Sequence, residues 1–324
     1  MDKRISIVIV TWNAKHFLKQ CILSVYRETK NLPFELIVVD NASSDGSMEM
    51  VKKEFPEVEL LRNDKNLGFS KANNRAIQKI LKEQRSDYIL LLNVDTLIRD
   101  RAINRLVSYL ESNPDAGAVS PALMLPSRRF QTGAGGYLPG AITGFNYFFF
   151  LSRLLPQVAK PLFIEQSVYS KKKGPVSVEW LSGACLTVKR EVVESIGLMD
   201  EDYYFYAEDI DWGRRMKRKG VRLHYLPWIS IIHYQGMNDE KSLREINTKW
   251  LMMLYKYVKK EKGQIEYVIF RFFSIVGFLL RLFLYALIYL FKKEDFLNRK
   301  IKEIYYFFIS ALIGREFKSL NITQ

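Results

Sequence analysis

Short apolar runs alternate with amphipathic segments along the first third of the chain. The runs are rich in β-branched residues and have the length of buried parallel strands. They are Ile5–Val10, Phe34–Val39, Val58–Leu61 and Tyr88–Leu92. The segments between them carry apolar residues at helical spacing and cover about 15–28, 48–55 and 70–81. This alternation predicts parallel βαβ units in a doubly wound α/β sheet.

The pattern is less regular further along the chain. Helices are predicted at about 101–110 and 209–219, and strands at 117–120, 221–226 and 229–233, while regular structure without an assigned type is expected at 176–188. Residues 126–175 break the pattern, because glycines stand among aromatic residues there, including Tyr147–Phe150. This stretch fits either an acceptor-side flap that touches lipid or a poorly ordered insertion.

The composition changes the picture in two respects. A net charge of +14 and a pI near 9.5 call for an acidic partner, such as nucleic acid, an anionic membrane or a phosphorylated substrate. The two cysteines, Cys21 and Cys185, are far apart, which argues against a disulfide framework and fits a reducing compartment. The apolar run after Arg4 is too short for a signal peptide and is interpreted as the first strand.

The last part of the chain is basic and aromatic. Tyr267–Phe291 is apolar and long enough to cross a bilayer as a helix. Arg281 near its middle would cost about 2.5–3.5 kcal/mol there, so we favour a helix in the membrane interface, with Arg271 and Arg281 reaching lipid headgroups. A true span and a buried pair with Ile304–Ile313 stay open. Because the cations stand beside apolar segments, we expect a lipid partner and no nucleic acid.

An aspartate follows the predicted strand Tyr88–Leu92 closely. Open α/β sheets bind ligands at the carboxyl ends of their strands, where a carboxylate is costly unless a cation or donor meets it. We therefore interpret Asp95 as the ligand of a divalent metal, Mn²⁺ or Mg²⁺, that holds the diphosphate of a nucleotide-sugar. The alternative is that Asn93 and Asp95 only turn the chain.

Sugar transfer needs further groups, and the sequence offers a candidate for each. Asp40 ends the second predicted strand and can accept a hydrogen bond from a pyrimidine N–H or a ribose hydroxyl. Asp209 or Glu208 can take the proton of the acceptor and so lead to inversion at the anomeric carbon. His233 is either a second metal ligand or a surface or core histidine. Trp180 is either a platform for a sugar ring or a buried packing residue.

Several motifs, in this order along the chain, resemble the family 2 glycosyltransferases of GT-A fold. They are Ser6–Asn13, Val38–Ser47, Asn66–Phe69 and Leu92–Thr96. Trp180–Ala184 and Phe205–Asp211 with Arg215 resemble the rhamnosyltransferase-like branch of that family. The resemblance spans about residues 4–236. It implies a Rossmann-like, mostly parallel central sheet flanked by helices, and an inverting, metal-dependent hexosyltransferase.

The resemblance also implies roles for individual residues. The catalytic residues would be Asp209 and Glu208, and the metal ligands Asp95 and His233. The nucleotide-sugar would contact Thr11, Asn13, Asp40, Asn41, Asn66, Gly68, Asn93 and Asp95. The acceptor would contact Trp180, Gly183 and Glu208. Asn93 departs from the fuller DxD pattern, which has a first aspartate there, so lower metal affinity or an inactive relative stays open.

The sequence thus predicts a glycosyltransferase at the cytoplasmic face of the cell membrane, moving rhamnose from dTDP-rhamnose to a lipid-linked or polysaccharide acceptor. Residues 1–240 would form the GT-A domain, with a nucleotide-binding half at 1–125 and an acceptor-side half at 126–240. Residues 241–324 would form a helical membrane-associating extension. A polyprenyl-phosphate glycosyltransferase and a non-catalytic, membrane-bound nucleotide-binding protein are the alternatives, and an oligomer is compatible with the sequence.

Overall fold

The chain folds into two compact units, each described here by itself. The computed structural model describes residues 5–156, 158–165, 174–235 and 248–316. The first unit comprises residues 1–136 and 163–239, and the second comprises 137–162 and 240–324. The sequence placed all of 126–240 in one domain, whereas the units divide the chain so that 137–162 joins the C-terminal helices. The predicted boundary between 240 and 241 lies outside the described residues.

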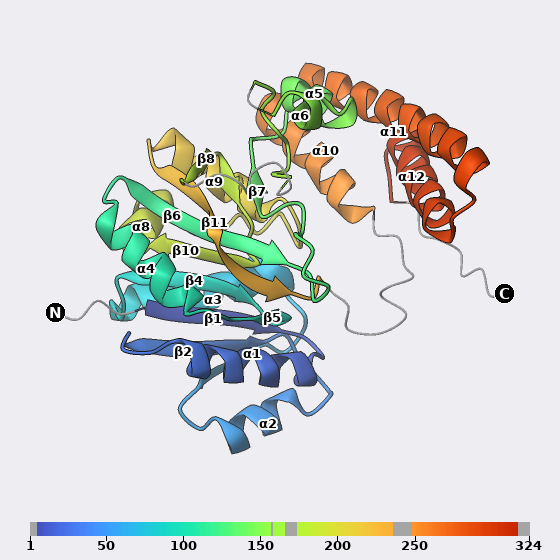
Figure 1. The fold of residues 1–324 in the computed structure, drawn as a ribbon. Helices are drawn as coiled ribbons and strands as arrows, with labels where there is room; N and C mark the ends of the chain where they lie inside the picture. The colour runs from blue at the N-terminus through green and yellow to red at the C-terminus, as the bar shows by residue number, and fades with distance from the viewer. Residues whose placement is uncertain (1–4, 157, 166–173, 236–247, 317–324) are drawn as a thin grey trace. The chain divides into compact units, whose positions relative to one another are not determined.

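The first unit is built on a nine-stranded sheet (Figure 1). Its strands are β1 (Ile5–Thr11), β2 (Phe34–Asp40), β3 (Glu59–Arg62), β4 (Tyr88–Asn93), β5 (Thr96–Leu97), β6 (Ala116–Met124), β8 (Val176–Val178), β10 (Cys185–Lys189) and β11 (Arg222–His233). The order is β3-β2-β1-β4-β10-β6-β11-β5, with β8 also paired to β11. A second, two-stranded sheet pairs β7 (Gly135–Gly136) with β9 (Trp180–Leu181).

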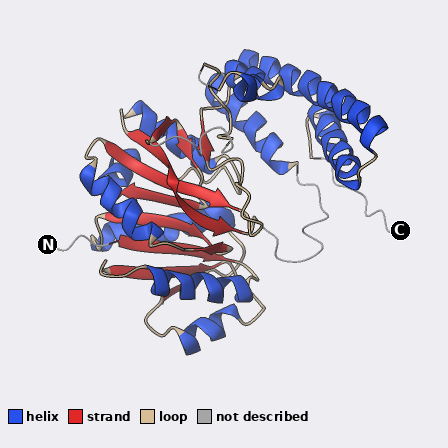
Figure 2. Cartoon of the chain, viewed as in Figure 1, coloured by secondary structure: helices blue, strands red, loops and turns tan. Residues whose placement is uncertain are grey.

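Helices flank the large sheet, as Figure 2 shows. They are α1 (Lys15–Glu28), α2 (Ser47–Glu54), α3 (Gly68–Glu83), α4 (Ala102–Ser112), α8 (Arg190–Ile196) and α9 (Glu208–Arg218). In Figure 1, α1 and α4 lie in front of the sheet and α3 lies behind it. The strands β1 to β4 run parallel to one another where they pair, and β10 is antiparallel to both β4 and β6. The predicted α/β fold with a mostly parallel sheet is confirmed.

The register of the central strands brings their carboxyl ends together. Thr11 on β1 lies opposite Asp40 on β2, and Val10 lies opposite Asn93 on β4. The apolar residues of these strands are almost all buried, because helices cover both faces of the sheet. The polar residues that follow the strands therefore meet at one edge of the sheet.

Local differences from the sequence expectation have identifiable causes. The two strands predicted at 221–226 and 229–233 are one strand, β11, with an irregularity between Leu226 and Ser230. Pro227 lies there, and proline cannot donate a ladder hydrogen bond, so it is confined to such breaks. Helix α3 begins at Gly68 rather than at Ser70, whose hydroxyl donates instead to the Tyr203 carbonyl at 2.6 Å.

The second unit is helical. It contains α5 (Ala141–Phe148), α6 (Leu151–Leu154), α10 (Lys249–Lys262), α11 (Gln264–Lys292) and α12 (Asp295–Ile313). Helix α11 packs against α5, α10 and α12. Gly277 of α11 allows this approach, since a Cβ there would lie 2.5 Å from the Phe148 Cβ of α5. Part of the stretch that was too irregular to assign from sequence is therefore regular helix.

The two arginines of α11 have partners inside the second unit. Arg271 donates to the Ala311 and Leu312 carbonyls near the end of α12, at 2.9 and 2.8 Å. Arg281 donates to the Tyr147 carbonyl, and its guanidinium lies 4.8 Å from the Tyr147 ring centre and 4.6 Å from that of Phe150. The structure differs here from the expectation that both side chains reach headgroups, because helix-end carbonyls and aromatic faces satisfy them internally.

Candidate active site

Asp40 lies at the carboxyl end of β2 with its side chain fully buried. Its Oδ1 accepts a hydrogen bond from the Ser43 N–H at 3.0 Å. Its Oδ2 lies 3.7 Å from Arg62 Nε and has no hydrogen-bond donor among the described residues. A buried carboxylate oxygen without a donor is costly. The geometry therefore favours a ligand that donates a hydrogen bond to Asp40.

Three asparagines join the loops beyond β1 and β2 to the start of α3. Asn13 Oδ1 accepts a hydrogen bond from the loop after β2 at 2.8 Å. Asn41 Nδ2 donates to the Gly68 carbonyl at 3.1 Å, and Asn66 Oδ1 accepts from the Gly68 N–H at 3.0 Å. Thr11 lies beside them, and its buried hydroxyl has no hydrogen-bond partner within the described ranges. All the residues predicted around the base and ribose thus gather at one edge of the sheet.

Asp95 and His233 come together although 138 positions separate them in the chain. The His233 Nε2 atom lies 3.3 Å from Asp95 Oδ1 and 3.3 Å from Asn93 Nδ2. The pairing of His233 with Thr96, which joins β11 to β5, brings the two side chains to the same place. Both are buried, so any charge between them is poorly screened by solvent.

Gln131 sets the state of the His233 ring. The His233 Nδ1 atom lies 2.7 Å from Gln131 Oε1, and an amide oxygen can only accept a hydrogen bond. The neutral ring thus carries its proton on Nδ1 and turns the lone pair of Nε2 toward Asp95. Two lone-pair atoms this close repel each other unless a proton or cation lies between them. Gln131 could not be identified from sequence, since it stands in an irregular stretch without a motif.

This pair fits a divalent metal in its donor atoms. Imidazole nitrogen and carboxylate oxygen are both ligands of Mn²⁺, and His233 has the second hydrogen bond that orients metal-binding histidines. No group of three His, Cys, Asp or Glu side chains suited to a metal occurs in the part of the chain that the structure describes. Asp95 and His233 would therefore share the ion with oxygens of a ligand.

Asp209 lies in the first turn of α9. Its Oδ2 accepts from the Gly183 N–H at 3.2 Å, and its Oδ1 accepts from the Ile210 N–H at 2.8 Å. Burial raises the pKa of Asp209 to about 6, although both hydrogen bonds act to lower it. A carboxylate with a pKa near neutrality is well matched to take a proton from a hydroxyl group.

Glu208 precedes Asp209 and is more deeply buried. Burial, and then the neighbouring charge of Asp209, raise the pKa of Glu208 well above its usual value. Its Oε2 has no hydrogen-bond partner among the residues described. The two carboxyl groups thus differ in degree, because Glu208 favours its protonated form more strongly, whereas two N–H groups offset part of the cost of burying the Asp209 anion.

A short path of hydrogen bonds links Asp209 to the Asp95 side of the site. The Ala184 carbonyl accepts from the Asn93 N–H at 3.0 Å, at the end where β10 pairs with β4. Gly183, the preceding residue, is the donor to Asp209. Asp209 and the pair Asp95–His233 therefore lie at the same end of neighbouring strands, in a single unit.

Trp180 packs inside the first unit and is 3% exposed. Its ring meets Phe163 edge to face at 5.9 Å between centres, and Gly213 of α9 lies against its backbone. Of the two interpretations of Trp180, the structure fits the packing residue rather than the sugar platform. Asp211 and Arg215 of α9 form an ion pair at 2.8 Å, and Arg215 also donates to the Ile196 and Leu198 carbonyls, which ties α9 to the end of α8 and the residues after it.

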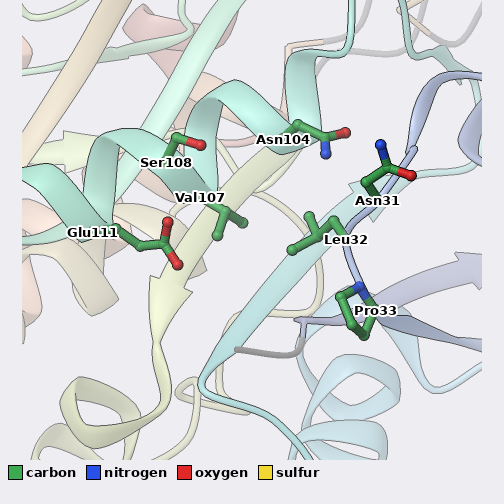
Figure 3. Close-up of a pocket in the computed structure, with 7 residues that line it drawn as sticks. All are labelled: Asn31, Leu32, Pro33, Asn104, Val107, Ser108 and Glu111. Atoms are coloured by element: carbon green, nitrogen blue, oxygen red, sulfur yellow. The ribbon is translucent and has the colours of Figure 1, made fainter. Parts of the chain in front are cut away.

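A separate cavity of about 620 Å³ lies between the loop before β2 and helix α4 (Figure 3). Residues 31–33 line it from one side and Asn104, Val107, Ser108 and Glu111 from the other. Pro33 precedes β2 whereas Asp40 ends it, so this cavity lies about 20 Å along the strand from the candidate site. None of the predicted site residues lines it.

Comparison with known proteins defines the class. Residues 6–132, which contain β1 to β4 and the polar residues that follow them, match the family model described as glycosyl transferase family 2. These residues are therefore similar to a family 2 glycosyltransferase domain, and the fold is that of the GT-A glycosyltransferases. Its relatives are rhamnosyltransferase-like.

Two curated relatives and one solved structure illustrate the similarity. An N-acetylglucosaminyl-diphospho-decaprenol L-rhamnosyltransferase of Mycobacterium tuberculosis is 27% identical over 243 residues, covering 73% of this chain and 78% of the relative. The dTDP-rhamnosyl transferase RfbF of Shigella flexneri is 24% identical over 241 residues, covering 74% and 72%. The mannosyltransferase PcManGT of Pyrobaculum calidifontis, solved with GDP-Man and Mn²⁺, has a TM-score of 0.60 at 16% identity, covering 97% of this chain and 87% of that one.

Proposed function

We propose that the protein is an inverting glycosyltransferase that moves rhamnose from dTDP-rhamnose to a lipid-linked or polysaccharide acceptor in cell-envelope glycan synthesis. The names of the two curated relatives support the sugar, the nucleotide and the lipid link. The observation that carries the proposal is the hydrogen bond from Gly183 to Asp209. It holds a carboxylate base at Gly183, two residues before β10, whose first residue Cys185 pairs with Leu92 of β4, directly before Asn93.

Asp209 is the general base of the proposed reaction. The acceptor hydroxyl transfers its proton to an Asp209 oxygen while its own oxygen bonds to the anomeric carbon. The bond from that carbon to the diphosphate breaks on the opposite side, so the configuration inverts. Glu208 favours its protonated form and is the poorer base, so we assign it to the acceptor side as a hydrogen-bond donor.

The donor lies along the ends of β1, β2 and β4 in this proposal. Asp40 accepts a hydrogen bond from the base or ribose, which satisfies its buried Oδ2. Asp95 and His233 would hold a divalent metal, whose charge stabilises the departing diphosphate when it is bound. The Asn93 amide donates to His233 Nε2 at 3.3 Å; a metal bound to that nitrogen would take the place of this hydrogen bond, while Gln131 would still orient the ring through Nδ1.

The second unit is proposed to associate with the cytoplasmic face of the membrane. Among the described helices, α11 alone is long and apolar enough to cross a bilayer. Its outward side chains include Phe272, Leu279, Phe283, Leu290 and Phe291. Lys292 and Lys293 at the end of α11 and Arg299 on α12 are exposed cations that suit anionic lipid. We favour association within the interface, because α11 packs along its length on α5 and α12.

Thermal-shift measurements with nucleotide-sugars and Mn²⁺ test the donor. Bound donor stabilises the fold by mass action, about 2.7 kcal/mol at one hundred times Kd, so dTDP-rhamnose should raise Tm more than UDP- or GDP-sugars. Transfer to a polyprenyl-diphosphate-linked N-acetylglucosamine, followed by NMR of the new anomeric centre, tests the reaction. Retention of configuration would refute the role of Asp209. Donor binding without turnover on any acceptor would favour the non-catalytic alternative.

A further inference from the structure

Four aromatic residues, Tyr203 to Tyr206, precede the carboxylates of α9, and two of them face solvent. Tyr204 is 57% exposed and Phe205 is 43% exposed, whereas Tyr203 is buried. Exposed aromatic rings on a loop beside a catalytic residue are a frequent form of ligand contact. This loop lies within the first unit, three to six residues before Asp209.

The loop is anchored rather than loosely attached. The Tyr203 carbonyl accepts from Ser70 Oγ at 2.6 Å, and the Tyr204 carbonyl accepts from the Phe69 N–H at 2.9 Å. The Tyr204 hydroxyl donates to Asn66 Oδ1 at 3.0 Å. Gly68 has φ +81°, and a Cβ there would lie 2.6 Å from the Tyr204 carbonyl oxygen. The absence of a side chain at Gly68 thus permits the loop to sit on the start of α3.

The backbone after Phe205 is in an unusual conformation. Tyr206 and Ala207 have φ of 71° and 69°, in the left-handed region that non-glycine residues rarely adopt. Such conformations cost free energy and persist where the surrounding structure holds them, often at ligand sites. Here they turn the chain sharply from the aromatic loop into α9, so Phe205 stays beside the first turn of the helix.

The rings of this loop continue to the proposed base. Phe205 meets Tyr206 at 4.4 Å and Phe69 at 6.1 Å between ring centres, both edge to face. Phe69 lies over Gly183, where a Cβ would be 3.0 Å from the ring. Gly183 is the donor that holds Asp209. An aromatic wall of Phe69, Phe205 and Tyr206 therefore runs up to the carboxylate.

We propose that Phe205, supported by Tyr206, is the platform on which the acceptor sugar ring stacks. The inference rests on the proposed function and adds the acceptor side of the same site. In an inverting displacement the acceptor approaches from the side of the base, away from the diphosphate. Phe205 precedes Asp209 by four residues, and its ring is linked through Phe69 to Gly183, the donor to Asp209. The apolar C–H face of a pyranose would cover its exposed ring, while Glu208 and Asp209 meet the hydroxyl groups.

Steady-state kinetics of Phe205→Ala, Phe205→Leu and Phe205→Trp test the platform. The acceptor is the one that the wild-type enzyme uses best among polyprenyl-diphosphate-linked N-acetylglucosamine, the corresponding disaccharides and aryl glycosides. Alanine should raise the acceptor KM about tenfold, as expected for the loss of an aromatic contact. Leucine should behave similarly, since it lacks a flat ring, and tryptophan should restore binding. The donor KM and the slow hydrolysis of donor without acceptor should change less than twofold.

Trp228→Ala is the matched control, because Trp228 is a similarly exposed aromatic residue of the first unit, on β11. It should leave both KM values unchanged. An unchanged acceptor KM in Phe205→Leu, or a raised donor KM instead, would overturn the role of Phe205 as platform. The proposed function would still stand in that case, provided that the wild type transfers the sugar. A wild-type protein that neither transfers nor hydrolyses any nucleotide-sugar would overturn the proposed function and the platform with it.

Discussion

The two units of the chain deal with apolar surface in opposite ways. In the first unit the apolar residues of the central strands are buried between helices, and polar groups without donors, such as Asp40 Oδ2, collect at the strand ends. In the second unit α11 keeps large apolar residues on its surface, while both of its arginines are satisfied internally. The first unit thus has polar groups that a donor would satisfy, and the second has an exposed apolar surface that the proposed membrane association would cover.

The largest expected effect tests the polar site of the first unit. Asp209→Asn removes the proton acceptor but retains an oxygen for the Gly183 N–H, so the loop should stay in place. General-base catalysis typically contributes about 10²–10⁴-fold, and we expect kcat for transfer to fall by that amount with the donor Kd unchanged. Kinetics and donor titration measure the two quantities separately. Wild-type turnover in this variant would remove Asp209 as the base.

The apolar surface of the second unit is tested by changing Phe272, Phe283 and Phe291 together to serine. Each buried phenylalanine contributes about 1.5–3 kcal/mol to transfer out of water, so binding to anionic vesicles should fall at least one hundredfold. Transfer to a water-soluble acceptor should be unaffected. Phe270→Ser is the internal comparison, because Phe270 is fully buried, and it should lower Tm instead. Vesicle sedimentation that is unchanged by the triple substitution would contradict the assignment of this surface.

A smaller effect is expected on the affinity of the first unit for a divalent metal. Asn93→Asp places a carboxylate beside His233 Nε2 and Asp95, where the wild-type amide donates a hydrogen bond. A second anionic oxygen is a better ligand for a hard cation than a neutral amide. We expect Mn²⁺ to bind about tenfold more tightly, which corresponds to 1.4 kcal/mol. Isothermal titration with Mn²⁺ in the absence of donor measures this change, and equal or weaker binding would place the ion elsewhere.

The sequence was informative where local pattern determines structure and weak where distant contacts do. The boundaries of α1 and the positions of Asp40 and Asp95 at strand ends followed from periodicity and from the rule for parallel sheets. The burial of Trp180 depends on Phe163 and Gly213, which are distant in sequence. The partners of Arg271 and Arg281 are carbonyls on other helices. Sequence spacing does not reveal such contacts, so contact with lipid headgroups was predicted instead. Gln131 orients His233 through a contact between residues 102 positions apart.

The smallest expected effect concerns stability and pH in the first unit. Burial raises the pKa of Asp209 from 3.8 to about 6 in the folded protein. The folded state therefore binds this proton more tightly than the unfolded state. This contribution to stability is complete below about pH 4 and is lost as the pH rises through 6. Asparagine carries no such charge, so Asp209→Asn should raise Tm by a few degrees at pH 7.5 and by nothing at pH 4.

Calorimetric Tm values of wild type and variant across this pH range give the measurement, and Asp202→Asn at an exposed position is the control. The same titration bears on catalysis, because the base acts only when ionised, so wild-type kcat/KM should fall as the pH drops below about 6. If Asp209→Asn instead lowered Tm at pH 7.5, and this loss of stability disappeared on acidification, the fold would stabilise the Asp209 anion. The carboxylate of Asp209 would then be satisfied by the protein alone, and the first unit would no longer differ from the second in having polar groups that need a ligand.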